Sequence, residues 1–461
     1  MSRRTITLFI SLGVVLLLGV GYNAARVWQT RQAAPEPFEP TPILGNFRAR
    51  EIVKIEVPGI TLERKGGIWE LTYLEGGPLS AQIKLDQMQV ERLTFSLANV
   101  WVDRIIEEEP EDLAMFGLAN PLSQTIVTDS TGRQAVFLLG YMNPSRTHFY
   151  VMEKGDPRVY TVSTFVTDSM LFTLDDIRQR RLFSPIPLQN LTKFRLETTE
   201  HVIEINTKPD DVPPHLTFSF TNHLLVSPYK LPRGANAENL NVLLNILNNL
   251  AIQEFIDDNP SSLRPFGLDQ PARIKLQSND SSLDLLVGSP VNGRHYAKLY
   301  GAPNVFTLGG MTGILNIRPV SLIDRFIILL SIDKVERLTI SGGENDLNVD
   351  FYGQGENMVF YLNGRRAEDR SFRTFYQAVI GLLVDAEIPR TPGPVAFSPD
   401  ENDRTIFIEF MLNTPPGHSY ISLIPYNRDF YALLQGGEME FLIARSQVRR
   451  IFEAADAVSI E

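Results

Sequence analysis

Hydrophobic and polar positions divide the chain into one long uncharged stretch and three stretches that repeat one order of patterns. Residues 6–25 carry no charged side chain and are mostly apolar. A helix of about 20 residues, at about 1.5 Å per residue, spans a hydrocarbon core of about 30 Å. The pattern therefore predicts a transmembrane helix at residues 6–25, within a cytoplasmic tip and anchor formed by residues 1–28.

The flanks of this apolar stretch predict its orientation. Arg3 and Arg4 precede it, and the positive-inside rule places such residues in the cytoplasm. The rest of the chain is then extracytoplasmic. Cleavage of a signal peptide is the main alternative, but it would place Tyr22 where a small residue is required. A helix buried in a soluble protein is a further alternative. We favour an uncleaved anchor, and the sequence leaves the question of cleavage open.

Prolines dominate the segment that follows, residues 29–42. They recur at Pro35, Pro37, Pro40 and Pro42. Such spacing favours extended polyproline conformation, which behaves as a semi-rigid spacer. The segment is expected to be a stalk that holds the folded part away from the membrane, and a disordered tether would place it similarly.

In three short stretches beyond the stalk, a basic residue precedes an apolar one and a second apolar residue follows two positions later. These stretches are residues 53–57, 192–196 and 336–340. Period-two alternation indicates a strand with one buried face. The three strands start about 140 residues apart, which is an ordinary domain length. Each is expected to open one module of a tandem repeat.

An apolar stripe with spacings of mostly three and four follows each opening strand and predicts a helix that faces the core. The stripes are Val90, Leu93, Leu97 and Val100; Leu240, Leu243, Leu247 and Leu250; and Phe372, Phe375, Val379 and Leu383. Asp86 and Gln89 predict a capping box at the start of the first helix.

Two further signatures recur after the helix. The sequences "PEDLAMFGLANP" (residues 110–121) and "PSSLRPFGLDQP" (residues 260–271) predict a short helical turn that ends at Gly117 and Gly267 in a left-handed cap. In the third copy "GPVAFSPDEND" (residues 393–403) stands at this place.

A strand–turn–strand pattern then appears three times: "FYVMEKGDPRVYTV", "HYAKLYGAPNVFTL" and "FYALLQGGEMEFLI", from residues 149, 295 and 430. Tyr150, Tyr296 and Tyr431 are taken as equivalent. Arginines at the end of each copy are expected to complement the C-terminus of a closing helix: Arg180, Arg181, Arg325, Arg449 and Arg450.

These patterns predict an α+β protein in which an N-terminal transmembrane helix precedes three tandem modules with antiparallel sheets. Each module has three strands, a helix, a capped turn, four strands and a second helix. The expected boundaries are residues 43–187 for module 1, 188–328 for module 2 and 329–461 for a divergent module 3.

The same landmarks resemble the bacterial domain-of-unknown-function 4340 family. The resemblance is carried in module 1 by "GGIWELTY" with Trp69, by "LAMFGLANP" and by "YVMEKGDPRVYTV". Module 2 matches except that residues 215–220 replace the tryptophan strand, and module 3 lacks the Phe-Gly-Leu turn. The resemblance implies a membrane-anchored envelope protein of the kind found with ABC-type export or gliding-type systems. It carries over no catalytic residues.

Charge and composition exclude several classes of partner and chemistry. The net charge of −11 argues against nucleic-acid partners, and the absence of cysteine excludes disulfides and thiolate chemistry. The histidines form no metal-ligand spacing; they are His148, His201, His215, His223, His295 and His418. The acidic runs at residues 107–112 and 257–258 are interpreted as solvated surface, with calcium binding as the alternative.

We therefore expect no enzyme activity, no cofactor, and no catalytic, cofactor-binding or metal residues. The expected function is a single-pass scaffold or interaction protein of the cytoplasmic (inner) membrane. It would be an accessory subunit of an ABC-type envelope system, with its bulk in the periplasm and protein partners there. The alternative is an extracytoplasmic protein that binds a lipid, glycan or peptide between modules. An envelope hydrolase is the remaining hypothesis.

Overall fold

The protein has a mixed α+β fold built on antiparallel sheets, as the sequence predicts. The computed structural model describes residues 21–22, 43–76, 83–212, 216, 219–343, 345–389 and 404–461. Its large sheets have eight, nine and nine strands. The chain divides into two compact units, Met1–Gln179 and Arg180–Glu461. The first sheet lies in the first unit and the other two lie in the second, and the predicted boundaries at residues 187 and 328 stay predictions.

The predicted anchor and stalk fall almost wholly outside the described residues. Of the span at residues 6–25, only Gly21 and Tyr22 are described, and both are helical. Within the described part of the chain, no helix combines the length and the apolar character needed to cross a bilayer.

The sheet of module 1 is formed by two antiparallel meanders whose first strands pair with each other. Its spatial order is β4-β3-β2-β7-β8-β9-β10-β6. The strands are β2 Ile52–Val57, β3 Ile60–Lys65, β4 Ile68–Leu74, β6 Arg104–Glu107, β7 Ser123–Asp129, β8 Gln134–Met142, β9 His148–Glu153 and β10 Val159–Ser163. A separate pair, β1 (Ile43–Leu44) and β5 (Val100–Trp101), precedes β2 and follows the helix.

Modules 2 and 3 repeat this order with one additional edge strand each. In module 2 the order is β14-β13-β12-β11-β16-β17-β18-β19-β15. The strands are β11 Lys193–Glu197, β12 Val202–Thr207, β13 His223–Ser227, β14 Arg233–Gly234, β15 Glu254–Asp257, β16 Ala272–Gln277, β17 Ser282–Val291, β18 Arg294–Leu299 and β19 Val305–Leu308. The third strand of module 2 is thus β13, and not the predicted residues 215–220.

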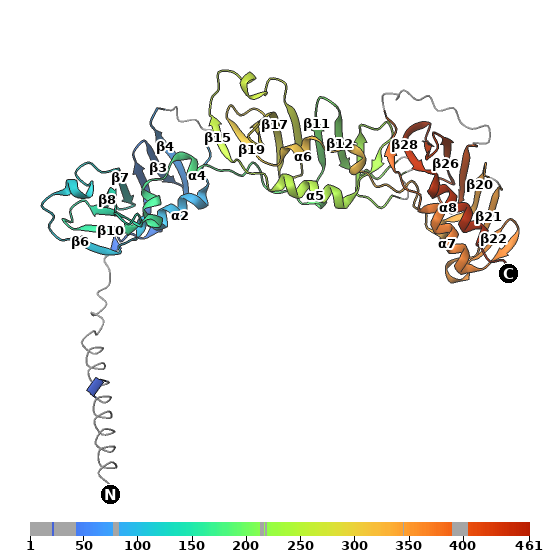
Figure 1. Cartoon of the computed structure of the whole chain (residues 1–461), viewed down its shortest axis with the longest axis horizontal. Coiled ribbons are helices and arrows are strands. Elements are labelled where there is room, and N and C mark those ends of the chain that lie inside the picture. The colour runs from blue at the N-terminus through green and yellow to red at the C-terminus, as the bar shows by residue number, and fades with distance from the viewer. Residues whose placement is uncertain are drawn as a thin grey trace, which may run out of the picture. The chain divides into compact units, whose positions relative to one another are not determined.

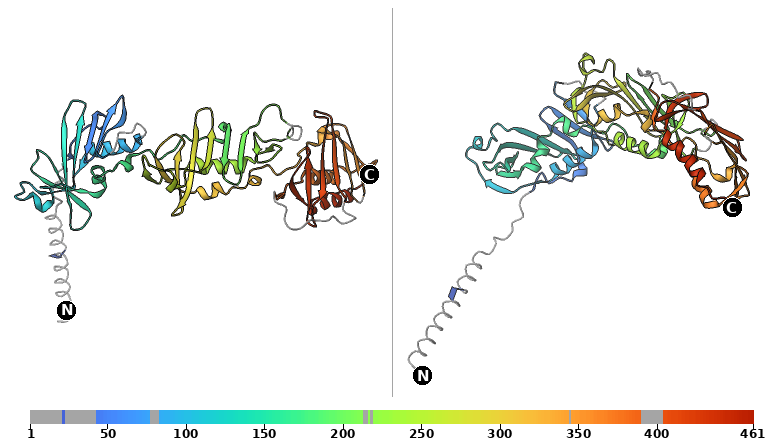
Figure 2. Two further views of the ribbon diagram at one scale, coloured as in Figure 1. Left: turned by 90° about the horizontal axis from the view of Figure 1, so that it is seen from above. Right: turned by 45° about the vertical axis from the view of Figure 1, so that its right-hand side comes forward.

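In module 3 the order is β23-β22-β21-β20-β25-β26-β27-β28-β24, and its strands lie side by side in Figure 2 (left). They are β20 Val335–Ser341, β21 Leu347–Tyr352, β22 Val359–Leu362, β23 Arg365–Ala367, β24 Ala386–Glu387, β25 Ile406–Leu412, β26 His418–Pro425, β27 Phe430–Gln435 and β28 Glu438–Ala444. The three sheets therefore have one topology, which confirms the repeat.

Each module carries one helix of 12 residues after its third or fourth strand: α2 Gln87–Ala98, α5 Ala237–Asn248 and α7 Asp369–Ile380. Figure 1 shows α2 and α5 each running along one face of its own sheet. The residues of the predicted stripes are buried except Leu383, where the prediction was wrong. Val100 and Leu250 are buried but lie beyond the ends of α2 and α5. Helix α7 ends at Ile380, and the buried residue beyond it is Leu382.

The start of each of these helices is hydrogen-bonded to the closing segment of its module, which is the stretch that follows the last strand of the sheet. The backbone N–H of the N-cap residue donates to a carbonyl oxygen of that segment at 2.8 Å in every case. The pairs are Asp86 with Ile177, Asn236 with Leu322, and Glu368 with Ser459. The side chain of Asp86 accepts from Met88 and Gln89 as predicted, but the reciprocal half of the predicted capping box is replaced by the contact with Ile177.

Two other expectations from the repeat were wrong. Tyr150 pairs with Thr161 and Tyr296 with Thr307. Tyr431 pairs with Ile443, whereas the residue equivalent to Thr161 and Thr307 is Leu442. Leu442 pairs with Ala432, so Ala432 is the structural counterpart of Tyr150 and Tyr296. Because side chains alternate along a strand, Tyr431 projects from the opposite face.

The expected role of the closing arginines was also wrong. Arg449 and Arg450 lie in the middle of helix α8 (Arg445–Asp456), and not at its end. Arg180, Arg181 and Arg325 lie outside helices. Arg181 pairs with Ala251, beyond the end of α5, and the Nε atom of Arg325 donates to the carbonyl oxygen of Val384 at 2.6 Å.

Candidate interaction site

His223, His295 and His148 each have a different local environment. The Nε2 atom of His223 lies 2.9 Å from the carbonyl oxygen of Leu191. His295 is buried, and burial lowers its pKa. His148 contacts Thr147 and Asp103. Among the described residues no three His, Asp or Glu side chains are placed to hold a metal ion; His215 lies outside that part of the chain.

The Phe-Gly-Leu turns pack onto the following strands. Gly117 and Gly267 adopt φ values of 72° and 65°, which confirms the predicted left-handed caps. The ring of Phe116 lies 5.0 Å from that of Tyr150, and the ring of Phe266 lies 5.1 Å from that of Tyr296, both at 68°. Edge-to-face aromatic contacts of this kind stabilise packing, so the motif has a structural role in both modules.

Two glycines that the sequence analysis did not single out make room for these turns. A Cβ atom on Gly140 would lie 2.1 Å from the carbonyl oxygen of Phe116, and one on Gly288 would lie 2.1 Å from that of Phe266. The signal was present, because both glycines occupy the same place in the strand after the turn. The corresponding part of module 3, residues 393–403, is outside the described residues.

Several side-chain contacts in the unit Arg180–Glu461 join modules 2 and 3. The loop between β13 and β14 packs against β24 and the hairpin of β27 and β28. The hydroxyl of Tyr229 donates to Glu387 Oε1 at 2.5 Å. The backbone N–H of Lys230 donates to Glu440 Oε1 at 2.8 Å, and its ammonium lies 2.7 Å from Glu438 Oε2. An acidic edge of module 3 thus receives an aromatic and a basic residue of module 2.

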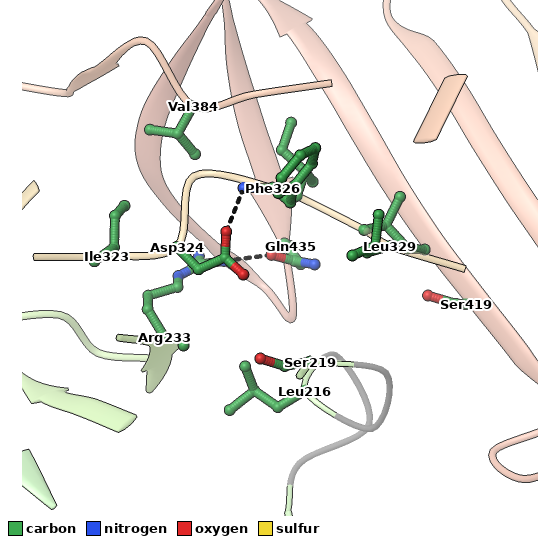
Figure 3. Close-up of a pocket in the computed structure, with 13 residues that line it drawn as sticks. Leu216, Ser219, Arg233, Ile323, Asp324, Phe326, Leu329, Val384, Ser419 and Gln435 are labelled. Atoms are coloured by element: carbon green, nitrogen blue, oxygen red, sulfur yellow. Dashed lines mark hydrogen bonds between the residues drawn. The ribbon is translucent and has the colours of Figure 1, made fainter. Parts of the chain in front are cut away.

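Arg233 occupies the centre of this junction. Its side chain is only 8% exposed, and it projects from β14 toward Gln435 (Figure 3). An Nη atom donates to Gln435 Oε1 at 2.5 Å, and the guanidinium carbon lies 4.7 Å from the ring centroid of Phe441. Burial lowers the pKa of Arg233, opposed by the nearby Glu440 and Tyr229. The Tyr229 pKa is raised by burial and by its bond to Glu387.

The hollow beside Arg233 is small. It has a volume of about 40 Å³, whereas pockets for small molecules usually measure about 300 to 1,000 Å³. A water molecule needs only about 10 to 15 Å³ by the same kind of measure. The hollow between modules 2 and 3 therefore suits water rather than a lipid or a glycan. Residues from both modules line it, including Leu216, Asp324, Phe326, Val384 and Ser419.

A second segment completes the junction. Residues beyond the closing segment of module 2 pair with those beyond helix α7: Val384 N–H donates to the Arg325 carbonyl at 2.8 Å, and Ile327 N–H donates to the Leu382 carbonyl at 3.2 Å. One cluster of buried apolar side chains runs from Phe183 to Val458 across both modules. Modules 2 and 3 thus share a continuous core.

Larger hollows lie within single modules. An apolar groove of about 270 Å³ lies between α5 and α6 (Met311–Leu315), lined by Val242, Ile246 and Ile314 among others. A more polar one of about 680 Å³ lies beside α8, with Arg404, Arg449 and Glu453 in its wall.

Comparison with known proteins gives one match. The family described as "Domain of unknown function (DUF4340)" matches residues 78–216 and 224–379. These segments cover most of modules 1 and 2, including both Phe-Gly-Leu turns, and they continue into module 3. The stretch "GGIWELTY" with Trp69 precedes the first segment. No curated protein and no solved structure matches the chain.

Proposed function

The chain belongs to the DUF4340 family, and from that premise we propose that it is a membrane-anchored scaffold whose extracytoplasmic modules bind protein partners. The partners are the subunits of an ABC-type envelope transport system, to which this protein is an accessory. The apolar residues 6–25 behind Arg3 and Arg4 support the anchor and its orientation.

The observation that carries the proposal is the junction between modules 2 and 3. There, one module of this fold recognises another through side chains that reach across the boundary: Tyr229 to Glu387, Lys230 to Glu438, and Arg233 to Gln435. Aromatic and arginine side chains are the residues that dominate protein interfaces. A fold that forms such a contact within its own chain is suited to form others with separate proteins.

Affinity purification of the full-length protein in mild detergent, followed by mass spectrometry, tests the proposal. A form without residues 1–28 is the control. Recovery of a nucleotide-binding subunit and a multispan permease with the anchored form is expected, with much less recovered by the control. Recovery of a bound small molecule and no protein would contradict the proposal.

Ligand binding remains a second candidate because of the apolar groove between α5 and α6. The groove is lined by aliphatic side chains that are partly exposed, such as Val242 and Ile246. A ligand that prefers the folded state raises its melting temperature. A lipid extract that raises the melting temperature of the wild-type protein, but not that of an Ile246→Glu variant, would support this candidate.

A further inference from the structure

Several large apolar side chains are exposed on or beside one edge strand of the sheet in module 1. Among the described strands, the edge strand β6 pairs with β10 alone. Ile105 and Ile106 on β6 are 40% and 39% exposed, Trp101 just before it is 60% exposed, and Phe165 just after β10 is 84% exposed. These four residues are called the β6 patch below. Exposed apolar patches on folded proteins commonly mark interaction sites.

Backbone and side-chain contacts bring the members of the β6 patch to one end of the sheet. The N–H of Asp103 donates to the carbonyl oxygen of Thr161 at 2.8 Å. Asp103 Oδ2 lies 3.6 Å from Nε2 of His148, which pairs with Ser163. Asp103 therefore lies beside the end of β10, two residues from Trp101 and two residues from Ile105.

The repeat identifies the equivalent positions in the other modules. Ile105 pairs with Tyr160, Phe255 pairs with Phe306, and Glu387 pairs with Phe441. The paired aromatic residues occupy the same place in the last strand of each sheet. Ile105, Phe255 and Glu387 are therefore structural counterparts on the three edge strands.

Both counterparts of Ile105 are covered by residues from upstream in the chain. The guanidinium carbon of Arg180 lies 5.4 Å from the ring centroid of Phe255. The hydroxyl of Tyr229 binds Glu387, and the neighbouring Lys230 binds Glu438. In each case the cover includes a cationic side chain that precedes the covered strand in sequence. Ile105 is 40% exposed among the residues of module 1 that the structure describes.

The charge beside the β6 patch is strongly negative. Five carboxylates follow Ile106 within six residues, and all are exposed: Glu107, Glu108, Glu109, Glu111 and Asp112. An anionic lipid surface would be repelled by this run. A protein surface with lysines and arginines would be attracted, and its association would be accelerated. Acidic side chains next to the covered strand of module 3 likewise meet Lys230.

From these observations we propose that the β6 patch is the docking surface for a separate protein. Its contact segment places apolar side chains against Ile105, Ile106, Trp101 and Phe165 and flanks them with lysine or arginine. The open backbone edge of β6 allows this segment to add as a further strand. The inference rests on the proposed function, because it names the surface through which the scaffold binds a partner.

A photoreactive amino acid at position 105 of the full-length protein, irradiated in its native membranes, tests the proposal. The matched control is position 68, because Ile68 is also an exposed isoleucine, 58% accessible, on the opposite edge strand β4 of the same sheet. The expected result is a crosslink from position 105, but not from position 68, to a peptide of another protein that contains apolar residues flanked by lysine or arginine. A crosslink to lipid, to residues 1–42 of this chain or to a second copy of the chain would overturn the proposal.

Charge reversal supplies the second readout. Glu107→Lys with Glu109→Lys should reduce the yield of this crosslink at least about tenfold, because the attraction becomes repulsion. Asp257→Lys with Asp258→Lys, the equivalent acidic run of module 2, should leave the yield unchanged. Equal yields for both double variants would overturn the proposal.

The two proposals fail in distinguishable ways. Transport subunits that co-purify with the protein while position 105 crosslinks to none of them would leave the proposed function intact and refute the docking surface. A chain that co-purifies with no protein and crosslinks to none would refute both.

Discussion

Arg233 and Gln435 lie 202 residues apart in sequence and form a 2.5 Å hydrogen bond inside the junction of modules 2 and 3. The arginine also covers the ring of Phe441. Because this guanidinium is almost completely removed from solvent, its partners decide whether the buried charge is tolerated.

Removal of Gln435 as a partner of Arg233 should therefore lower the free energy of unfolding. Gln435→Leu leaves the buried guanidinium without this acceptor and should destabilise the protein by about 2 to 4 kcal/mol. The double variant Arg233→Met with Gln435→Leu removes both polar groups and should recover at least half of that loss. Urea unfolding of the detergent-solubilised protein measures both. A double variant that is less stable than Gln435→Leu alone would contradict this account of the junction.

The glycines beneath the Phe-Gly-Leu turns should not accept even a methyl group. Gly140→Ala and Gly288→Ala each bring a Cβ atom against a carbonyl oxygen, and overpacking of this kind costs about 1 to 3 kcal/mol. Gly313→Ala is the control, because Gly313 lies in helix α6 and, apart from its chain neighbours and the backbone of its own helix, no atom lies within 4 Å of its Cβ position. It should be neutral or slightly stabilising. Thermal unfolding distinguishes the three variants, and equal melting temperatures would contradict the packing described.

Asp156 should make stability depend on pH in the acidic range. The bond from Arg158, opposed by burial and assisted by Tyr160, lowers its pKa from 3.8 to about 2. A carboxylate with a depressed pKa contributes stability that is complete above its unfolded pKa and lost as the pH falls through its folded pKa. Asp156→Asn should therefore be less stable than wild type at pH 7, and the difference should shrink between about pH 4 and pH 2. A difference that stays constant to pH 2 would exclude this carboxylate as its source.

The predicted membrane topology can be tested by labelling single introduced cysteines, because the natural chain has none. Ser261→Cys is at an exposed position of module 2, and a membrane-impermeant maleimide should label it while the inner membrane is intact. In the proposed orientation the positive-inside rule places the end with Arg3 and Arg4 in the cytoplasm, so Ser2→Cys should be labelled only after permeabilisation. The reverse pattern would invert the proposed orientation.

Local patterns in the sequence are sufficient to predict the repeat and most of the residues in its core. Strands with period-two alternation bury the expected residues, such as Ile55 and Leu338, because one face of each sheet packs on a helix. The Phe-Gly-Leu turn is predictable because a glycine with positive φ is a local requirement. The end of α7 was also predictable, since Gly381 at its C-cap marks a helix stop before Leu383.

The remaining features depend on contacts that the sequence does not display. The pairing register of the third hairpin shifts between Leu433 and Leu434. A β-bulge of this kind changes which face of the sheet the following side chains occupy, and the spacing of residues in the sequence does not reveal it. The junction around Arg233 joins residues from different modules, so no local sequence pattern predicts it. The equivalence of Ile105, Phe255 and Glu387 follows from the pairing register of the edge strands, which the sequence does not display.

Quantitative co-purification from native membranes tests the central claim most directly, with three forms compared: the full-length wild type, Ile105→Asp, and Ile68→Asp as control. The account predicts that transport subunits are recovered with the wild type and with Ile68→Asp, and that recovery with Ile105→Asp falls at least about tenfold because a charge is introduced into the contact. Equal recovery with all three forms, or no protein partner with any of them, would contradict it.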